Sequence, residues 1–216
     1  SPTMDDLKQT IADYYKLEKN NVFVGNGSDE VLAFSFMAFF EPGKDILFPE
    51  ITYSFYPVYA KLFHISYKKI PLTEDYQLDV EAFFHSEGGV IFPNPNAPTS
   101  IYLTLEQVEE IIKNNRDKVV IVDEAYIDFA PQSAVSLIEK YDNLLVIQTF
   151  SKSRALAGLR VGFALGNKQL IAALIRMKDS FNSYPVDRLA LAGAKAAIED
   201  KGYFQEITKK IIETRK

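Results

Sequence analysis

Lys152 lies in the part of the sequence with the clearest chemical character. The residues before it, Leu144–Thr149, have the apolar content of a short buried strand, and the lysine follows the carboxyl end of that strand. In open α/β sheets, ligands bind at this edge. An amine that is partly removed from water loses its proton more readily and can then attack a carbonyl carbon. The sequence therefore predicts a nucleophilic lysine, although a plain surface lysine at a strand end is the simpler interpretation.

Hydroxyl and cationic side chains surround this lysine. Thr149, Ser151 and Ser153 flank it, and Arg160 begins the next predicted strand. Hydroxyl groups together with a guanidinium form the usual make-up of a phosphate site. A second anion-binding element is expected at Gly25–Asp29, which joins a short strand to an apolar helix, because the N–H groups at a helix N-terminus attract anions. An ordinary strand-to-helix turn with a serine cap remains the alternative for this segment.

Three further residues could contact an aromatic heterocycle. Asp123 follows the predicted strand Val119–Val122, and a carboxylate there could hold a protonated ring nitrogen. Tyr126 could donate to a phenolate oxygen, and Tyr53 could stack on a ring. Taken singly, these are a capping aspartate and two of 12 tyrosines. Together with the lysine and the anion-binding residues, they match the groups that pyridoxal phosphate requires.

The elements that would position these residues alternate along the chain. Strands are predicted at Val22–Val24, Asp45–Phe48, His64–Ile70, Gly89–Phe92, Val119–Val122, Leu144–Thr149 and Arg160–Leu165. This rhythm predicts an α/β fold, with a mostly parallel, roughly seven-stranded sheet covered by helices on both faces. Only residues 150–159 separate the last two strands. A parallel crossover needs about a dozen residues or more, so we expect the strand near 160–165 to be antiparallel.

Helices are predicted between the strands from turn and capping signals. Thr104 followed by Gln107 has the pattern of a capping box. Other helices are expected at Tyr53–Phe63, Asp79–Phe84 and Ala134–Lys140.

Composition narrows the class of protein. A length of 216 residues, with 47% apolar and 25% charged residues, suits one large domain or a domain and a further piece. A net charge of −5 without a basic tract argues against binding of nucleic acid. The chain has no cysteine, and His64 and His85 lack metal-ligand spacing, so no metal site is expected. No signal pattern or membrane-spanning apolar run occurs, which favours a cytoplasmic protein without a membrane partner.

Five sequence motifs now make a family resemblance specific. They are GNGSDE (25–30), PEITYSFY (49–56), NPNAPTS (94–100), VDEAYIDF (122–129) and TFSKSRALAGLRVGFALG (149–166). In this order they resemble the large domain of fold-type I pyridoxal-phosphate enzymes, and most closely the histidinol-phosphate aminotransferases. The resemblance covers nearly the whole chain. It says more about the superfamily than about the substrate.

The resemblance implies a role for each matching residue. Lys152 would bond the cofactor's aldehyde carbon and later move the substrate proton, and Asp123 would keep the pyridine nitrogen protonated. Tyr126 would bond the phenolic oxygen, and Tyr53 would stack on the ring. The phosphate would be surrounded by Gly27, Ser28, Asp29 through its backbone N–H, Thr149, Ser151 and Arg160.

One motif departs from the family pattern, which is Asn-Pro-Asn-Asn-Pro-Thr-Gly. Ala97 stands where the family has the asparagine that bonds the phenolic oxygen, and Ser100 stands in place of the glycine. An alanine methyl group cannot donate a hydrogen bond. We expect Asn96, or alternatively Asn94, to supply the missing contact to the cofactor.

The resemblance also implies an activity and a domain organisation. Residues 1–216 would form the large domain of a longer enzyme, with an N-terminal segment and a small C-terminal domain absent from this sequence. The uncovered apolar stripe of Phe204, Ile207 and Ile211 agrees with this expectation. The implied enzyme is a homodimer that transfers the amino group of L-histidinol phosphate to 2-oxoglutarate in histidine biosynthesis.

Other functions stay open at this stage. A decarboxylase of a phosphorylated amino acid or an aromatic aminotransferase would use the same cofactor residues, since the arginine that recognises the substrate is expected outside this chain. A PLP-fold sensor domain that does not catalyse is a further alternative. An ATPase would require the G-x-x-x-x-G-K-[ST] loop, which the sequence lacks.

Overall fold

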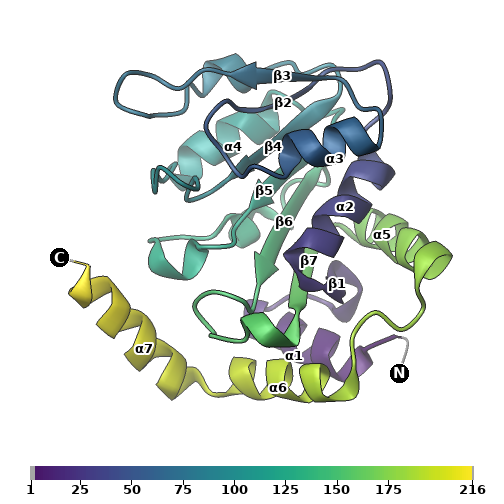
Figure 1. The fold of residues 1–216 in the computed structure, drawn as a ribbon, viewed down its shortest axis with the longest axis vertical. Coiled ribbons are helices and arrows are strands. Elements are labelled where there is room, and N and C mark those ends of the chain that lie inside the picture. Colours follow the sequence, from purple (N-terminus) through teal and green to yellow (C-terminus); the bar gives the residue numbers. More distant parts are fainter. Residues whose placement is uncertain (1–2, 216) are drawn as a thin grey trace.

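The computed structural model describes residues 3–215, so that residues 1, 2 and 216 of the expected domain lie outside the described part. Within residues 3–215 the strands form one seven-stranded sheet in the order β1-β7-β6-β5-β4-β2-β3 (Figure 1). The strands are β1 (Val22–Asn26), β2 (Ile46–Pro49), β3 (Tyr67–Ile70), β4 (Gly89–Pro93), β5 (Val120–Asp123), β6 (Leu144–Thr149) and β7 (Val161–Gly166). Each of them coincides with a predicted strand, with differences at the ends.

The direction of β7 confirms the expectation drawn from its short connection. β7 pairs antiparallel with β6, with Thr149 opposite Gly162, and it also pairs antiparallel with β1. The pairs β6–β5, β5–β4, β4–β2 and β2–β3 are all parallel. The carboxyl ends of β4, β5 and β6 therefore lie at one edge of the sheet, where the predicted site residues follow them.

Seven α-helices are present in the described part of the chain. They are α1 (Asp5–Tyr15), α2 (Gly27–Phe39), α3 (Tyr56–Leu62), α4 (Leu105–Lys113), α5 (Lys168–Phe181), α6 (Arg188–Glu199) and α7 (Lys201–Thr214). The capping box before α4 is confirmed, because Thr104 and Gln107 exchange hydrogen bonds between side chain and backbone.

Three helix predictions need correction. The segments predicted at Asp79–Phe84 and Ala134–Lys140 contain only short 3₁₀ helices, Glu81–Phe83 and Ala134–Leu137. Both segments are short connectors with buried side chains, and such connectors commonly close i to i+3 hydrogen bonds. The third helix, α3, begins at Tyr56 rather than Tyr53, with Pro57 in its first turn, where proline is tolerated.

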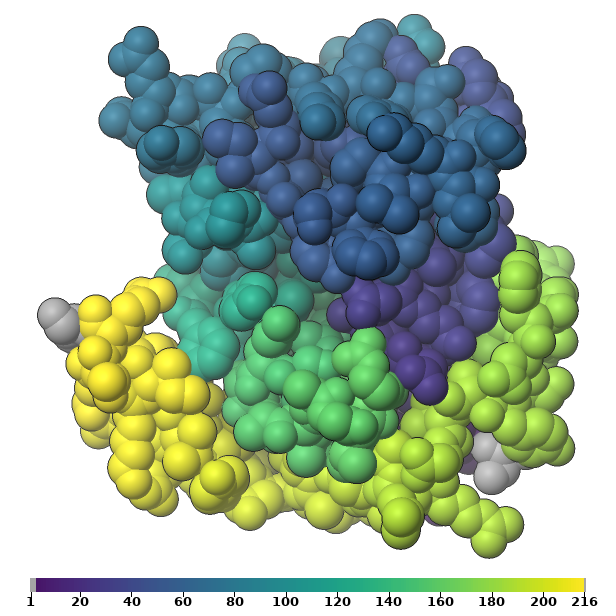
Figure 2. Space-filling model, in the orientation of Figure 1, coloured from purple at the N-terminus to yellow at the C-terminus, as the bar shows by residue number. Residues whose placement is uncertain are grey.

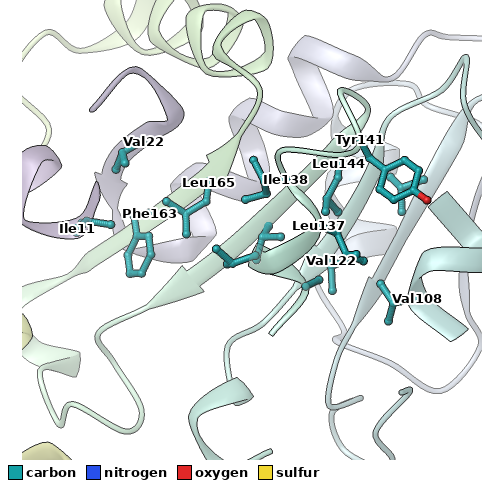
Figure 3. Close-up of a cluster of buried hydrophobic side chains, with 14 of the residues drawn as sticks. Ile11, Val22, Val108, Val122, Leu137, Ile138, Tyr141, Leu144, Phe163 and Leu165 are labelled. Atoms are coloured by element: carbon teal, nitrogen blue, oxygen red, sulfur yellow. The ribbon is translucent and has the colours of Figure 1, made fainter. Parts of the chain in front are cut away.

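The core consists of two apolar clusters, one on each face of the sheet. Because side chains alternate along a strand, Leu144 and Val146 of β6 enter one cluster while Leu145 and Ile147 enter the other. Helices α1, α4 and α6 cover the first cluster, part of which is shown in Figure 3. Helices α2, α3 and α5 cover the second. The expected α/β fold with helices on both faces is confirmed.

Helix α7 lies at the periphery and contributes little to this core. Among the described residues of this helix, Thr208 alone has a buried side chain, and Ile211 is 45% exposed. The guanidinium of Arg154, in the loop after β6, lies 3.8 Å from the ring centroid of Phe204. Among the described helices, none combines the length and the apolar character needed to cross a bilayer.

Gly162 of β7 allows the sheet to approach the N-terminus of α2. A Cβ atom at this position would lie 2.3 Å from Ser28 N and 2.4 Å from the carbonyl carbon of Gly27. We therefore expect Gly162→Ala to lower the free energy of unfolding by about 3 kcal/mol, since backbone on both sides must shift. Urea unfolding measures this loss. Gly158→Ala is the matched control, because a Cβ there meets nothing within 4 Å. Equal stability of the two variants would contradict the prediction.

Candidate active site

A cavity of about 140 Å³ lies at the carboxyl edge of the sheet. Nine of the predicted site residues line it: Ser28, Asp29, Tyr53, Asp123, Tyr126, Thr149, Ser151, Lys152 and Arg160. They come from the start of α2, the loop before α3, the last residues of β5 and β6, and the segments that follow these two strands. Pro93, Pro95, Ala97 and Ala125 complete the wall. Residues separated by more than a hundred positions in sequence thus meet at one site, as the predicted topology requires.

Asp123, the last residue of β5, is the buried acid of this cavity. It is 5% exposed, and its carboxylate accepts hydrogen bonds from Tyr56 Oη at 2.8 Å and from the backbone N–H of Ala125 at 3.2 Å. Burial raises the pKa of Asp123 to about 6, while these two hydrogen bonds act in the opposite direction. Above that pH the cavity holds a buried negative charge, which is suited to a cationic ring atom.

Lys152 reaches the same cavity from the loop after β6. Its ammonium lies 5.2 Å from the ring centroid of Tyr126, within the range of a cation–π contact. The lysine side chain is exposed. The expectation that its position removes it from bulk water is therefore wrong for this structure, because the loop after β6 leaves it open to solvent. The predicted proximity of the amine to Asp123 is present, since both line one cavity.

Asp29 and Arg160 form an ion pair in the wall of the cavity. Nη2 of Arg160 lies 2.9 Å from Asp29 Oδ2, and Tyr53 donates to Asp29 Oδ1 at 2.8 Å. The carboxylate of Asp29 is thus bound to a cation and a hydroxyl. Its backbone N–H belongs to the first turn of α2, which offers positive potential to an anion.

Gly27 lies beneath this ion pair rather than in the cavity wall. Its φ of +75° is in the left-handed region, and a Cβ atom there would be 2.5 Å from Nη2 of Arg160. A glycine is therefore needed for the guanidinium to lie against the N-terminus of α2. Thr149 accepts a hydrogen bond from the backbone N–H of Ser151 at 3.1 Å, which fixes the turn that carries both hydroxyl groups.

The asparagines of the 94–100 loop hold the loop itself. The amide of Asn96 donates to Ile51 O at 3.0 Å and to Thr99 Oγ1 at 2.9 Å, and Asn94 exchanges two hydrogen bonds with the backbone of Leu103. Ala97, not Asn96, lines the cavity. Both N–H groups of Asn96 already donate hydrogen bonds within the loop, so a bond to a ligand would require one of them to be released. The contact of Asn96 with a ligand stays a prediction.

A buried glutamate that sequence reasoning did not single out lies beside the site. Glu124 accepts hydrogen bonds from Ser133 Oγ at 2.6 Å, from Gln148 Nε2 at 2.8 Å and from the backbone N–H of Ala134 at 2.7 Å. Tyr15 in turn donates to Gln148. This network ties β5 and β6 to α1 next to Asp123 in the sequence. The apolar run Val119–Val122 directly before Asp123 and Glu124 is the feature of the sequence that indicates burial of Glu124.

The buried carboxyl of Glu124 should make stability depend on pH. Burial raises its pKa from 4.5 to about 7, so between these values the folded state binds the proton that the unfolded state has released. Stability from this group is therefore present below pH 4.5 and is lost as the pH rises through about 7. The shift corresponds to roughly 3 kcal/mol.

Replacing Glu124 with glutamine tests this expectation. The variant should lose less stability than the unmodified protein between about pH 5 and about pH 8, because an amide does not titrate. Urea unfolding at several pH values gives the difference. Parallel curves for the two proteins would contradict the assignment of this pH dependence to Glu124.

A larger cavity of about 580 Å³ adjoins the first. The two cavities share Pro95, Ala97 and Tyr126. The far wall of the larger cavity includes Ile211, Ile212 and Arg215, near the end of α7. Figure 2 shows the recess between this helix, in yellow, and the rest of the molecule. A small ligand bound next to Lys152 therefore has open space beside it.

Comparisons with known proteins match nearly the whole chain. The family model for aminotransferase class I and II matches residues 1–216. The chain is 65% identical over 215 residues to histidinol-phosphate aminotransferase 1 of Oceanobacillus iheyensis, covering 100% of this chain and 61% of that protein. It is 59% identical over 214 residues to histidinol-phosphate aminotransferase of Clostridium beijerinckii, covering 99% of this chain and 60% of that protein.

A solved structure gives the same picture of the fold. Histidinol-phosphate aminotransferase from Sinorhizobium meliloti, crystallised in complex with pyridoxal-5′-phosphate, superposes with a TM-score of 0.90 at 27% identity. The match covers 99% of this chain and 60% of the crystallised chain. The present chain thus spans about three fifths of the length of these relatives.

Proposed function

Since the chain belongs to the class I and class II aminotransferase family, we propose that it forms the cofactor-binding domain of an aminotransferase that uses pyridoxal phosphate and acts on L-histidinol phosphate, with 2-oxoglutarate as the amino acceptor. The observation that carries the proposal is that Lys152 and Asp123 line one cavity. The names of the relatives at 65% and 59% identity support the choice of substrate.

The residues of the cavity fit the chemical groups of pyridoxal phosphate. The amine of Lys152 suits the aldehyde, and the carboxylate of Asp123 suits the pyridine nitrogen. The N-terminus of α2, the hydroxyl groups of Ser28 and Ser151, and Arg160 suit the phosphate. The ring of Tyr53 offers a stacking surface and Tyr126 a phenolic donor. Thr149, which also lines the cavity, and Gly27, which lies against Arg160 outside it, would complete the surroundings of the phosphate.

Each of these residues has a defined task in amino transfer. Bound pyridoxal phosphate supplies an electron sink for the charge that develops on the substrate carbon. Asp123 holds a proton on the ring nitrogen, and its buried charge is more effective than one in water. The Nζ atom of Lys152 takes the proton from the α-carbon of the amino donor. Arg160 pairs with Asp29 and would also bind the phosphate, which would fix the position of the ring.

A panel of amino donors tests the proposal with the full-length protein. With 2-oxoglutarate present, L-histidinol phosphate should give glutamate with a kcat/KM at least about tenfold above that of phenylalanine or tyrosine. A preference for the aromatic donors would assign an aromatic aminotransferase. A phosphorylated amino acid such as O-phosphothreonine is included in the panel, and release of CO₂ from it without formation of glutamate would indicate a decarboxylase of a phosphorylated amino acid. Cofactor binding without turnover of any donor would indicate a sensor domain.

The assembly and location of the enzyme belong to the same proposal. The family resemblance implies a homodimer in the cytoplasm, with a small-molecule amino donor and a 2-oxo acid as its substrates. Analytical ultracentrifugation of the full-length protein measures the assembly. A monomer that turns over at the full rate would contradict the dimeric part of the proposal alone.

A further inference from the structure

Tyr56 contacts the candidate acid from behind the cavity. Its hydroxyl donates to Asp123 Oδ2 at 2.8 Å, while the backbone N–H of Ala125 donates to Oδ1 at 3.2 Å. Tyr56 is fully buried and does not line the cavity. Each carboxylate oxygen of Asp123 therefore accepts one hydrogen bond from the protein. Two such bonds fix the plane of the carboxylate and leave its remaining lone pairs for a ligand.

The ring of Tyr56 is held by the core on the α2 side of the sheet. Its centroid lies 5.9 Å from that of Phe48, 6.5 Å from that of Phe36, and 5.7 Å from that of Tyr53 in an edge-to-face contact. The hydroxyl is thus presented to Asp123 by a packed side chain that has no room to turn away. The loop before α3 and the first residue of this helix thus position the candidate stacking ring, Tyr53, and the partner of the acid, Tyr56, next to each other.

The charge state of Asp123 depends on the groups that face it. The titratable groups that act on it are the carboxylate of Asp29, the amine of Lys152, and the hydroxyl groups of Tyr53, Tyr56 and Tyr59. Burial raises the pKa of Asp123 to about 6, and the hydrogen bond from Tyr56 is the largest effect that lowers it. Asp29 raises it further, and Lys152 lowers it.

We propose that Tyr56 is a positioning residue for Asp123, whose hydroxyl orients the carboxylate and favours its ionised form, so that the carboxylate can hold the protonated ring nitrogen of the cofactor. The inference rests on the proposed binding of pyridoxal phosphate in this cavity. Tyr56 acts through Asp123 and touches no reacting atom. Its effect must therefore disappear when Asp123 can no longer ionise.

Cofactor affinity measured against pH tests the role of Tyr56. Pyridoxal phosphate is titrated into the full-length protein and followed by visible absorbance, with no amino donor present. Tyr56→Phe keeps the ring in its packing and removes one hydrogen bond from the ionised carboxylate. The pH at which affinity falls should move upward by about one unit, which gives about fivefold weaker binding at pH 6 and about tenfold weaker binding at pH 5. The two affinities should converge at high pH, where both carboxylates are ionised.

Two control variants separate positioning from general damage. In the Asp123→Asn background, Tyr56→Phe should change affinity by less than about twofold at any pH, because residues that act as one unit are not additive. Tyr67→Phe removes a hydroxyl from a ring stacked on the same Phe48 at 4.9 Å and should leave the pH profile unchanged.

The possible failures are distinguishable. A protein that binds no pyridoxal phosphate at any pH overturns the proposed function, and this inference with it. Normal binding with an unmoved pH profile in Tyr56→Phe overturns the inference alone. A loss that is equal at every pH and persists in the Asp123→Asn background also overturns it, since that result describes a structural defect.

Discussion

Lys152→Ala should bind no pyridoxal phosphate covalently and should lower turnover by about 10⁴-fold or more, because the variant lacks both the amine that bonds the cofactor and the base that moves the substrate proton. The visible absorption band of the lysine-bound cofactor should be absent after reconstitution and desalting. The side chain is exposed, so the free energy of unfolding should change by no more than about 0.5 kcal/mol. Absorbance, steady-state turnover and urea unfolding together measure these three outcomes.

Two further variants separate the chemistry of the amine from its charge. Lys152→Arg keeps a cation beside the Tyr126 ring but cannot act as a nucleophile, since a guanidinium does not lose its proton in proteins. It should be as inactive as the alanine variant. Lys168→Ala, at an exposed position on α5 away from the cavity, should behave like the unmodified protein. A normal visible band in Lys152→Ala would remove the lysine from its assigned role.

The strands and the location of the site followed from local patterns in the sequence. Buried parallel strands are short apolar runs such as Leu144–Thr149, and their carboxyl ends meet at one edge. Asp123 and Lys152 both follow such runs, so their meeting in one cavity could be expected without coordinates. The reversal of β7 followed from the limited reach of residues 150–159.

Contacts between distant side chains could not be predicted in the same way. Tyr56 is one of 12 tyrosines, and only the packing of α3 against the sheet brings its hydroxyl to Asp123. The pairing of Asp29 with Arg160 depends likewise on the antiparallel approach of β7 to β1. The exposure of Lys152 depends on how the loop after β6 is covered, which residue types do not reveal. Such contacts and exposures are determined by how distant segments pack in the tertiary structure, which the local pattern of residue types does not specify.

Asp123→Ala should retain part of its affinity for pyridoxal phosphate while turnover falls by about 10³-fold. The amine of Lys152 and the anion-binding end of the cavity remain in the variant, so the cofactor keeps two of its three anchors. A charge pair 4 Å apart is worth about 4 kcal/mol at an effective dielectric constant of about 20. When that energy is realised in the transition state it corresponds to about three powers of ten in rate.

The same loss should follow from Asp123→Asn, although the two variants differ in their effect on packing. Asparagine fills the space and can still accept the hydrogen bond from Tyr56, whereas alanine leaves that buried hydroxyl without an acceptor at a cost of about 1–3 kcal/mol. Turnover, cofactor affinity and urea unfolding of both variants therefore distinguish the charge from the packing. If Asp123→Asn turned over at a near-normal rate, a neutral amide would suffice at the ring nitrogen, and the partnership between a buried carboxylate and a protonated pyridine would have to be abandoned.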